Sequence, residues 1–473
     1  MIACHRFASY GLLFGETARM SSETTEGVVE DVAIDVPTSS SKALAVTRNV
    51  AELREASRRR WQELLRIRPA DEVKQLLSHR GVPDEERLKT APSAIKLNAM
   101  ALFTQSFVAD EKTVTFTESV FAKVCHSMTR RNFEDADYRE FFFGLDKVLR
   151  GGRLHPLPPS LQLLRGAFFT VEGPSLCGKS AYVARLVQAF EGAFSFYGTG
   201  KEPGLMSVIP CLFISYPECG TRAGLLREIR YKIEAHIGRI DTPTGVFPEV
   251  EGNDSLNAVI SLCLLVNVGI LVIDGASFHR LSGEPQEILK LLVRLQHGSG
   301  IVVMLAGTPA FMNCVELAGS DSSNFFSGQT LSLGPLQSPL DKEGNLDKKS
   351  RFYTVVLWFW RAATLPSGTP MPSQLPLWMY QLTLGRLGWL VQVFEDLHIE
   401  LIKKPNLVTA LTYEELAKIA RRRLNRQLSA RQVVTESMER KTIADDKDFF
   451  NYIDHFPKSL LDTKKYRELL TRG

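Results

Sequence analysis

The sequence lacks several patterns that would place the chain in a specialised class of protein. None of its seven cysteines forms a CxxC pair or stands at zinc-ligand spacing from a histidine, and such a scattered, odd set of thiols is typical of a reduced intracellular protein. No apolar run reaches the ~20 residues that a membrane-spanning helix needs. A formal net charge of +4 over 473 residues does not by itself indicate nucleic acid. These absences predict a cytoplasmic protein without a membrane segment, long enough for about three domains.

Residues 1–48 are predicted to be a disordered leader. The first twenty contain Glu16 and no small-residue cleavage pattern, which argues against a targeting signal and leaves Met20 as an alternative start. Residues 21–42 are acidic and rich in serine and threonine. A helical extension is predicted over residues 49–109. Its basic triplet at residues 58–60 is interpreted as a solvated helix face, with DNA contact as the alternative.

Residues 110–340 are predicted to form the main domain, an α/β fold with a parallel sheet and helices on both faces. Within it, short apolar runs alternate with amphipathic runs of 10–15 residues, which is typical of βα units. A helical domain is predicted over residues 341–428, which hold four of the five tryptophans, and a charged tail over residues 429–473. The predicted strands are Gly166–Glu172, Val208–Tyr216, Ile270–Asp274, Ile301–Ala306 and Leu331–Leu333.

A phosphate-binding loop is predicted at residues 173–180. The run GPSLCGKS fits the pattern G-x-x-x-x-G-K-[ST], with an apolar strand before it and an amphipathic helix after it. Glycines let such a loop curl so that backbone N–H groups point at phosphate oxygens, and the helix adds the positive end of its dipole. Lys179 is expected to reach the β- and γ-phosphates, and the Ser180 hydroxyl to ligate Mg²⁺. The residues expected to bind ATP are Gly173, Pro174, Ser175, Leu176, Cys177, Gly178, Lys179, Ser180 and Ala181.

Cys177 has two possible roles in this loop. Amide dipoles and Lys179 would lower the pKa of its thiol and make it reactive towards electrophiles. The sequence favours the other role, in which the side chain only fills space in the loop, and the reactive thiol is the alternative.

A magnesium-binding aspartate is predicted at the end of the run GILVID, residues 269–274. Four apolar residues followed by an acid describe a central strand that delivers the Asp274 carboxylate to the edge of the sheet where ligands bind. The ATPase class with an additional strand between these two motifs usually carries a glutamate next, which orients the attacking water. Here that residue is Gly275, and loss of a general base typically costs about 10²–10⁴ in rate. Glu218, after a neighbouring predicted strand, is a candidate substitute.

Two further positions bear on hydrolysis. Thr308, after the fourth strand, stands where such ATPases place a polar residue that senses the γ-phosphate. No lysine or arginine occurs between Leu295 and Asp341, the stretch that usually presents an arginine finger worth about 10³–10⁵ in rate. The sequence therefore predicts that ATP and Mg²⁺ bind while hydrolysis is impaired.

The ordered set of motifs resembles a known family. "GPSLCGKS", "CLFISYPECGTRAGLLREI", "LVIDGASFHRL", "VVMLAGTPAFM" and "LPLWMYQLTLGRLGWLVQVFEDLHIELI" look like the AAA+ regulators of DNA transposition, the TnsC/TniB type, over roughly residues 110–425. The resemblance implies an ATP-dependent homo-oligomer, a ring or filament, on duplex DNA. It also implies partners, namely transposase subunits and a target-selection protein. By position, Arg386 corresponds to a lid arginine near the γ-phosphate, with a surface helix arginine as the alternative.

The resemblance also implies where DNA would bind. In this family the contact comes mainly from the region after the second strand, which here carries Arg222, Arg227, Arg230 and Lys232. Such charges would neutralise phosphates with little reading of bases, whereas the alternative is a hydrated amphipathic helix. The arginine triplet at residues 421–423 is a second candidate surface, for DNA or an acidic partner.

Three other functions remain as alternatives. The chain could be a degenerate subunit in a hetero-oligomer with an active ATPase. It could instead be a signalling or scaffold NTPase that acts through protein partners without DNA. A small-molecule kinase would need an acceptor pocket beside the loop, and the large helical domain argues against it.

Overall fold

The structure is a computed structural model of the chain. It describes residues 52, 54–82, 86–131, 136–149, 158, 167–190, 192–197, 205–237, 256–281, 285–317, 328–361, 365–366, 368–441 and 450–461. The predicted leader and residues 442–449 and 462–473 of the predicted tail lie outside this set. Leu53–Gly473 form one compact unit, and the features below belong to it.

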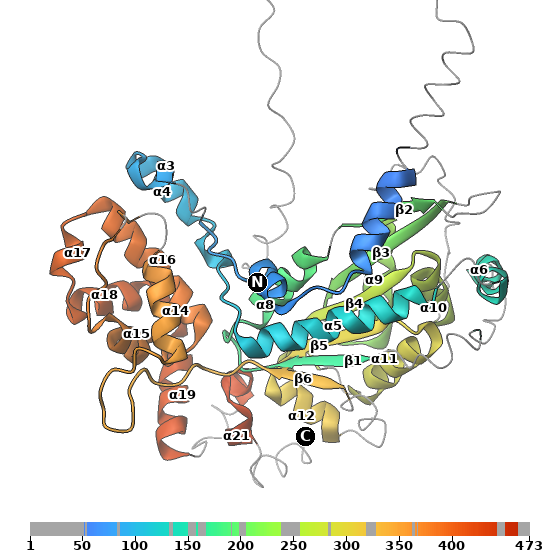
Figure 1. The fold of residues 1–473 in the computed structure, drawn as a ribbon. Helices are drawn as coiled ribbons and strands as arrows, with labels where there is room; N and C mark the ends of the chain where they lie inside the picture. The colour runs from blue at the N-terminus through green and yellow to red at the C-terminus, as the bar shows by residue number, and fades with distance from the viewer. Residues whose placement is uncertain are drawn as a thin grey trace, which may run out of the picture. The chain divides into compact units, whose positions relative to one another are not determined.

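A six-stranded sheet forms the centre of this unit (Figure 1), in the order β2-β3-β4-β5-β1-β6. β1, β3, β4, β5 and β6 are parallel, whereas β2 is an antiparallel edge strand on β3. The sheet is therefore mixed, which corrects the expectation of a purely parallel one. The strands are β1 (Phe168–Glu172), β2 (Phe194–Tyr197), β3 (Leu205–Ser215), β4 (Val268–Ala276), β5 (Val302–Gly307) and β6 (Gln329–Ser332).

All five predicted strands are present, and β2 is the one that pattern analysis missed. It has only four residues, and its pairing partners Leu205–Val208 lie at the start of β3, partly before the predicted start of that strand. A short edge strand with alternating aromatic and polar residues gives little periodic signal. Phe196 of this strand packs on Trp61, with ring centroids 5.1 Å apart.

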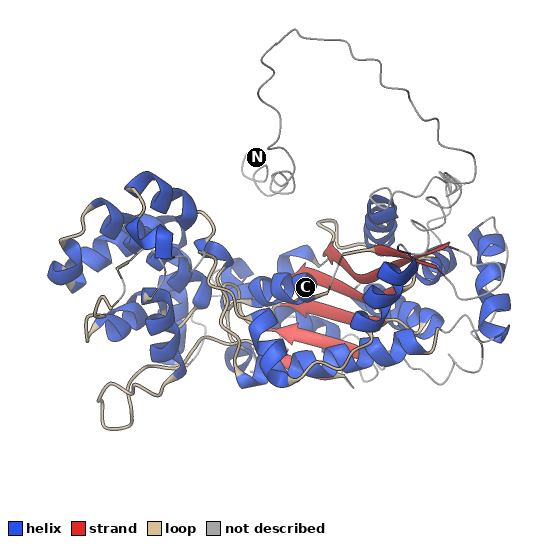
Figure 2. Ribbon diagram, turned by 45° about the horizontal axis from the view of Figure 1, so that its top comes forward, coloured by secondary structure: helices blue, strands red, loops and turns tan. Residues whose placement is uncertain are grey.

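Alternation along the strands produces two apolar faces, and each face is covered by helices (Figure 2). In β4, Ile270 and Val272 lie in one core cluster, while Leu271 and Ile273 lie in the other. Successive side chains of a strand point to opposite faces, so a strand buried on both sides is apolar throughout. The prediction of an α/β fold with helices on both faces is confirmed.

Different helices cover the two faces. The first face packs against helical residues 54–64, α2 (Ala70–Leu77), α5 (Glu111–Thr129) and α8 (Lys179–Ala189). The second packs against α6 (Ala136–Leu149), α9 (Arg222–Ile237), α10 (Leu256–Leu265), α11 (Pro285–Ser299) and α12 (Pro309–Leu317). The long helix α5 begins with a capping box, in which Asp110 and Thr113 each bond the other's backbone N–H.

A second apolar core lies among the helices after residue 350. Trp360 and Trp389 are almost wholly buried in it, and Trp358 and Trp378 pack at its margin. Met100 and Phe103 share this core, so part of the helical extension packs with the C-terminal helices. Its elements are α3 (Glu86–Thr90), α4 (Ser93–Met100), η1 (Phe103–Gln105), α14 (Arg351–Trp360), α15 (Leu375–Thr383), α16 (Leu387–Lys403), α17 (Leu407–Ala410) and α18 (Tyr413–Leu424).

Several short elements complete the described chain. η2 (Phe278–Arg280) follows β4, while η3 (Asn425–Gln427) and α19 (Leu428–Arg440) follow α18. η4 (Ile453–His455) and α21 (Lys458–Leu461) lie near the end of the chain. None of the described helices is both long and apolar enough to cross a membrane.

Candidate nucleotide-binding site

The loop at residues 173–180 joins β1 to α8, at the carboxyl edge of the parallel strands. Gly178 is the N-cap of α8 and has φ +94°, a conformation that glycine adopts without strain. A Cβ on Gly173 would lie 2.0 Å from the backbone oxygen of Leu333, so no side chain fits there. Ser180 and Ala181 lie in the first turn of α8, where free backbone N–H groups and the helix dipole favour an anion.

Lys179 lies folded over the start of this loop. Its Nζ donates to the backbone oxygens of Gly173 (2.6 Å) and Pro174 (2.9 Å). Burial lowers the pKa of Lys179, and the negative charges of Asp274 and Asp454 oppose this effect. One of these two carboxylates comes from a segment about 280 residues after the loop.

Asp274 lies near the carboxyl end of β4, as predicted. Its residue is only 9% exposed, and its Oδ1 has no hydrogen-bond partner among the described residues. A buried carboxylate oxygen without a partner is costly unless a cation or donor satisfies it. No group of three His, Cys, Asp or Glu side chains that could hold a metal occurs among the described residues. A magnesium ion at Asp274 would take its other ligands from Ser180, phosphate oxygens and water. Mg²⁺ commonly binds in this way, through one or two carboxylates together with phosphate and water.

The backbone conformation at Gly275 also favours glycine. Its φ is +86°, and the pairing of β4 with β5 shifts register between Ile273 and Ala276. Arg280 fills the space beside it: its Nη1 donates to the backbone oxygens of Tyr216 and Gly275, each at 3.3 Å. The backbone itself is therefore shaped for glycine at this position. The candidate substitute, Glu218, lies exposed on the turn after β3.

Thr308 follows β5 and is 4% exposed. Its backbone N–H donates to the oxygen of Ala276 (3.0 Å), so it lies against the end of the aspartate strand. Its hydroxyl donates to Oδ1 of Asp454. The structure thus brings Thr308 to the same edge of the sheet as Lys179 and Asp274.

Arg386 is 1% exposed, so the alternative of a surface helix arginine is wrong. It is the N-cap residue of α16 and donates from Nη1 to the backbone oxygen of Ser175 (2.7 Å). Its Nη2 donates to the backbone oxygen of His455, and its guanidinium lies 5.0 Å from the ring centroid of Trp389. Burial lowers the pKa of Arg386. A second link joins α16 to the loop, from the N–H of Gly388 to the oxygen of Leu176 (2.7 Å).

Asp454 and His455 were not predicted as site residues. The Asp454 carboxylate also accepts from the backbone N–H of Phe278 (2.9 Å), and its Oδ2 lies 3.9 Å from Nε2 of His279. The N–H of Ser175 donates to the backbone oxygen of Asp454 (2.7 Å). These residues lie about 280 positions after the loop in a charged stretch, and no motif in the sequence marks them.

Cys177 is buried, and burial raises the pKa of its thiol more than the nearby cations lower it. The alternative of a lowered pKa and a reactive thiol is therefore wrong, and the buried side chain fits the predicted role of filling space in the loop. Cys219 is the contrasting case. It is exposed, and a hydrogen bond with Thr221 lowers its pKa.

The predicted DNA surface lies on α9. Arg227 is exposed there, whereas Arg230 pairs with Glu234 (2.8 Å) and Arg222 lies 4.0 Å from Glu287. Lys232 lies beside the ring of the exposed Tyr231. The basic side chains of α9 are therefore partly neutralised by acidic neighbours.

Two other predicted basic clusters have partners within the unit. Arg422 pairs with Asp396 and Glu400, and Arg423 pairs with Glu395 and Asp396. In the earlier triplet, Arg60 donates to the backbone oxygen of Gly192 (2.7 Å) and lies over the ring of Phe194. These contacts reduce the charge available to an outside ligand.

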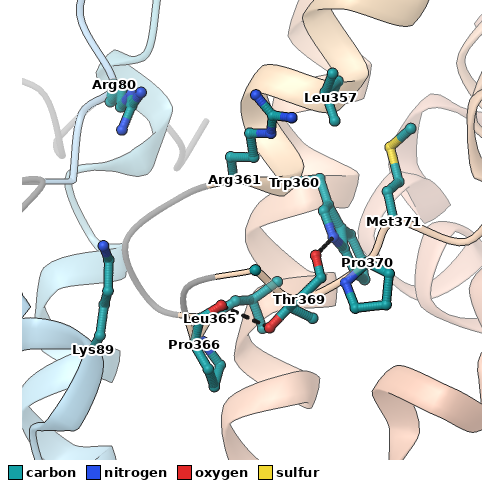
Figure 3. Close-up of a pocket in the computed structure, with 11 residues that line it drawn as sticks. Arg80, Lys89, Leu357, Trp360, Arg361, Leu365, Pro366, Thr369, Pro370 and Met371 are labelled. Atoms are coloured by element: carbon teal, nitrogen blue, oxygen red, sulfur yellow. Dashed lines mark hydrogen bonds between the residues drawn. The ribbon is translucent and has the colours of Figure 1, made fainter.

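A cavity of about 500 Å³ opens beside the end of α14 (Figure 3). Arg80, Lys89 and Arg361 line it together with Trp360, whose indole N–H donates to the oxygen of Thr369 (3.1 Å). Lys89 pairs with Glu86, and Arg80 lies over the ring of Trp358. The residues of the phosphate-binding loop are not among those that line the cavity, so the cavity does not belong to the site at the sheet edge.

Neither a scan against protein-family models nor a search of curated proteins finds a match to this chain.

Proposed function

We propose that the chain binds ATP with Mg²⁺ at the loop and uses binding, rather than rapid hydrolysis, to control its assembly state. The observation that carries the proposal is the buried, unpartnered Oδ1 of Asp274 at the same edge of the sheet as the phosphate-binding loop. A strand-end carboxylate and a loop of this kind, joined by a cation, are the two halves of an Mg²⁺–nucleotide site.

An AAA+ architecture is the fold that best accounts for the surroundings of the loop. β5 lies between the loop strand β1 and the aspartate strand β4, which is the additional strand of that ATPase class. The helices after residue 350 contact the loop through Arg386 and Gly388, which supports a lid role for them. Within this proposal Thr308 senses the γ-phosphate and Arg386 is the lid arginine.

Slow hydrolysis follows from the conformation at Gly275. No carboxylate can be presented from a glycine, and Arg280 already occupies the adjacent space. Loss of the base costs about 10²–10⁴ in rate. Glu218, exposed after β3, remains the substitute to test by replacement with glutamine.

The finer proposal is a regulator of DNA transposition of the TnsC/TniB type. In this proposal the chain assembles on duplex DNA through α9 and links a target-selection protein to transposase subunits. The support for the DNA contact is the exposed Arg227 with its neighbours on α9. The ion pairs of Arg222 and Arg230 instead favour the second candidate, a nucleotide-dependent scaffold that acts through proteins.

The deciding experiment measures assembly size, binding to a DNA duplex and phosphate release with ATP, ADP or no nucleotide. The transposition proposal expects DNA binding that needs ATP, weakens steeply with salt and is lost in Arg227→Glu. Arg139→Glu, an exposed arginine of α6, is the control for added negative charge. ATP-dependent assembly without DNA binding would favour the scaffold. No difference among ATP, ADP and no nucleotide in assembly size, DNA binding or phosphate release would contradict both.

A further inference from the structure

Asp454 and His455, two consecutive residues, accept hydrogen bonds from three donor groups of the candidate nucleotide site. The backbone oxygen of Asp454 accepts from the N–H of Ser175, its carboxylate accepts from the Thr308 hydroxyl, and the backbone oxygen of His455 accepts from Arg386. One donor belongs to the phosphate-binding loop, and the other two are the groups assigned above to the terminal phosphate. Three oxygens of the protein thus stand where phosphate oxygens would be bound.

A separate apolar anchor holds this segment in place. Ile453, Phe456 and Leu461 are wholly buried, and they pack with Ala310 of α12 and Val434 of α19. Figure 1 shows α21 beside α12, and Lys458 pairs with Glu316 of that helix (3.5 Å). Because these contacts lie apart from the three oxygens, the anchor can be weakened without altering a group that would touch nucleotide.

We propose that residues 452–461, the C-terminal plug, compete with the terminal phosphate of a nucleoside triphosphate, so that plug docking and triphosphate binding exclude each other. This inference rests on the nucleotide binding proposed above. The donors can serve either set of oxygens but not both. The Asp454 carboxylate, which accepts from the Thr308 hydroxyl, would also face the charge of the incoming phosphate. A diphosphate lacks the competing group and should bind with the plug in place.

The geometry favours a plug over a catalytic role for Asp454. Its Oδ1 already accepts two hydrogen bonds, from Thr308 and from the N–H of Phe278. A carboxylate that orients water would have to remain in the site with the triphosphate. Here the same residue also holds the loop N–H of Ser175 through its backbone oxygen, a contact that an incoming phosphate must break.

The first test compares equilibrium binding of ATP and ADP, each with Mg²⁺, by Phe456→Ala and the wild-type chain. The apparent affinity equals the intrinsic affinity multiplied by the fraction of molecules that can bind. A plug that is docked about nine-tenths of the time therefore lowers the apparent affinity for ATP about tenfold. Phe456→Ala should therefore bind ATP about tenfold more tightly, with ADP changed less than about twofold. Met438→Ala removes an apolar side chain that is half exposed on α19, and it should leave both affinities unchanged.

The second test uses the wild-type chain, so it does not depend on a variant that folds. Backbone hydrogen exchange of residues 450–461 should be slow without nucleotide and with ADP. It should become up to about tenfold faster with a non-hydrolysable ATP analogue, because release of the plug exposes its backbone.

The outcomes separate the plug from the underlying proposal. Absence of both ATP and ADP binding would contradict nucleotide binding itself. Normal ATP binding with unchanged affinity in Phe456→Ala, or with residues 450–461 still protected, would overturn the plug alone. Asp454→Asn keeps an acceptor oxygen but removes the charge. If it abolished phosphate release while ATP affinity stayed the same, Asp454 would be the missing carboxylate and the plug would again be refuted.

Discussion

Replacing Gly275 by glutamate would restore the usual sequence of the aspartate strand, but we expect it not to restore hydrolysis. Gly275 has φ +86°, a region in which a residue with a Cβ is strained by about 1–3 kcal/mol. A Cβ there would lie 3.1 Å from Nη1 of Arg280, so that side chain must also shift. Because β4 is irregular at this position, the side chain of the new glutamate would point in a different direction from that of a residue in a regular extended strand.

The assay measures phosphate release and urea unfolding of Gly275→Glu side by side. We expect the free energy of unfolding to fall by about 1–3 kcal/mol and phosphate release to rise less than about tenfold, against the 10²–10⁴ that a working base supplies. Gly275→Ala introduces the same backbone strain without a carboxylate. Gly344→Glu is the matched control away from the site, since Gly344 has φ +85° and nothing within 4 Å of an added Cβ.

One result would refute the reasoning about Gly275. If Gly275→Glu released phosphate at least a hundredfold faster than the wild type with unchanged stability, the backbone would be free to present a glutamate. Hydrolysis would then be limited by side-chain identity alone. If Gly344→Glu and Gly275→Glu lose equal stability, the contact with Arg280 adds nothing to the cost of the conformation.

Three further predictions concern single side chains. Lys179→Ala should lower the affinity for ATP about 10–100-fold, which is the contribution of a charge-assisted hydrogen bond. The control Lys290→Ala should leave the affinity unchanged. Equal affinities of the two variants by equilibrium dialysis would contradict the proposed site. His398 is buried and burial lowers its pKa from 6.5 to about 4, so the unfolded chain binds a proton first and stability falls as pH drops from about 6.5 to 4. His398→Leu should remove up to about 3 kcal/mol of that loss in urea unfolding followed by tryptophan fluorescence, and an unchanged pH profile would refute it. Iodoacetamide should label Cys219 well before Cys177 in the folded chain, and the reverse order by mass spectrometry would contradict the burial of Cys177.

Much of the fold follows from local patterns in the chain. Continuous apolar runs such as GILVI identify strands buried on both faces, because only such strands can be apolar on both sides. The two loop glycines are also predicted by the motif. A side chain does not fit at Gly173, and Gly178 has a positive φ. Lys179, Asp274 and Thr308 could be assigned to one edge because the carboxyl ends of parallel strands meet there.

The tertiary structure alone decided the rest of the site. Whether Arg386 is buried depends on how α16 docks on the loop, and its own sequence neighbourhood is compatible with a surface position as well. The conformation of Gly275 depends on the register between β4 and β5 and on Arg280. Asp454 and His455 reach the loop from about 280 residues away because Ile453 and Phe456 pack against apolar side chains of α12 and α19. Local propensity and spacing reflect interactions between near neighbours in the chain, whereas this contact depends on burial between segments that meet only when the whole unit has folded.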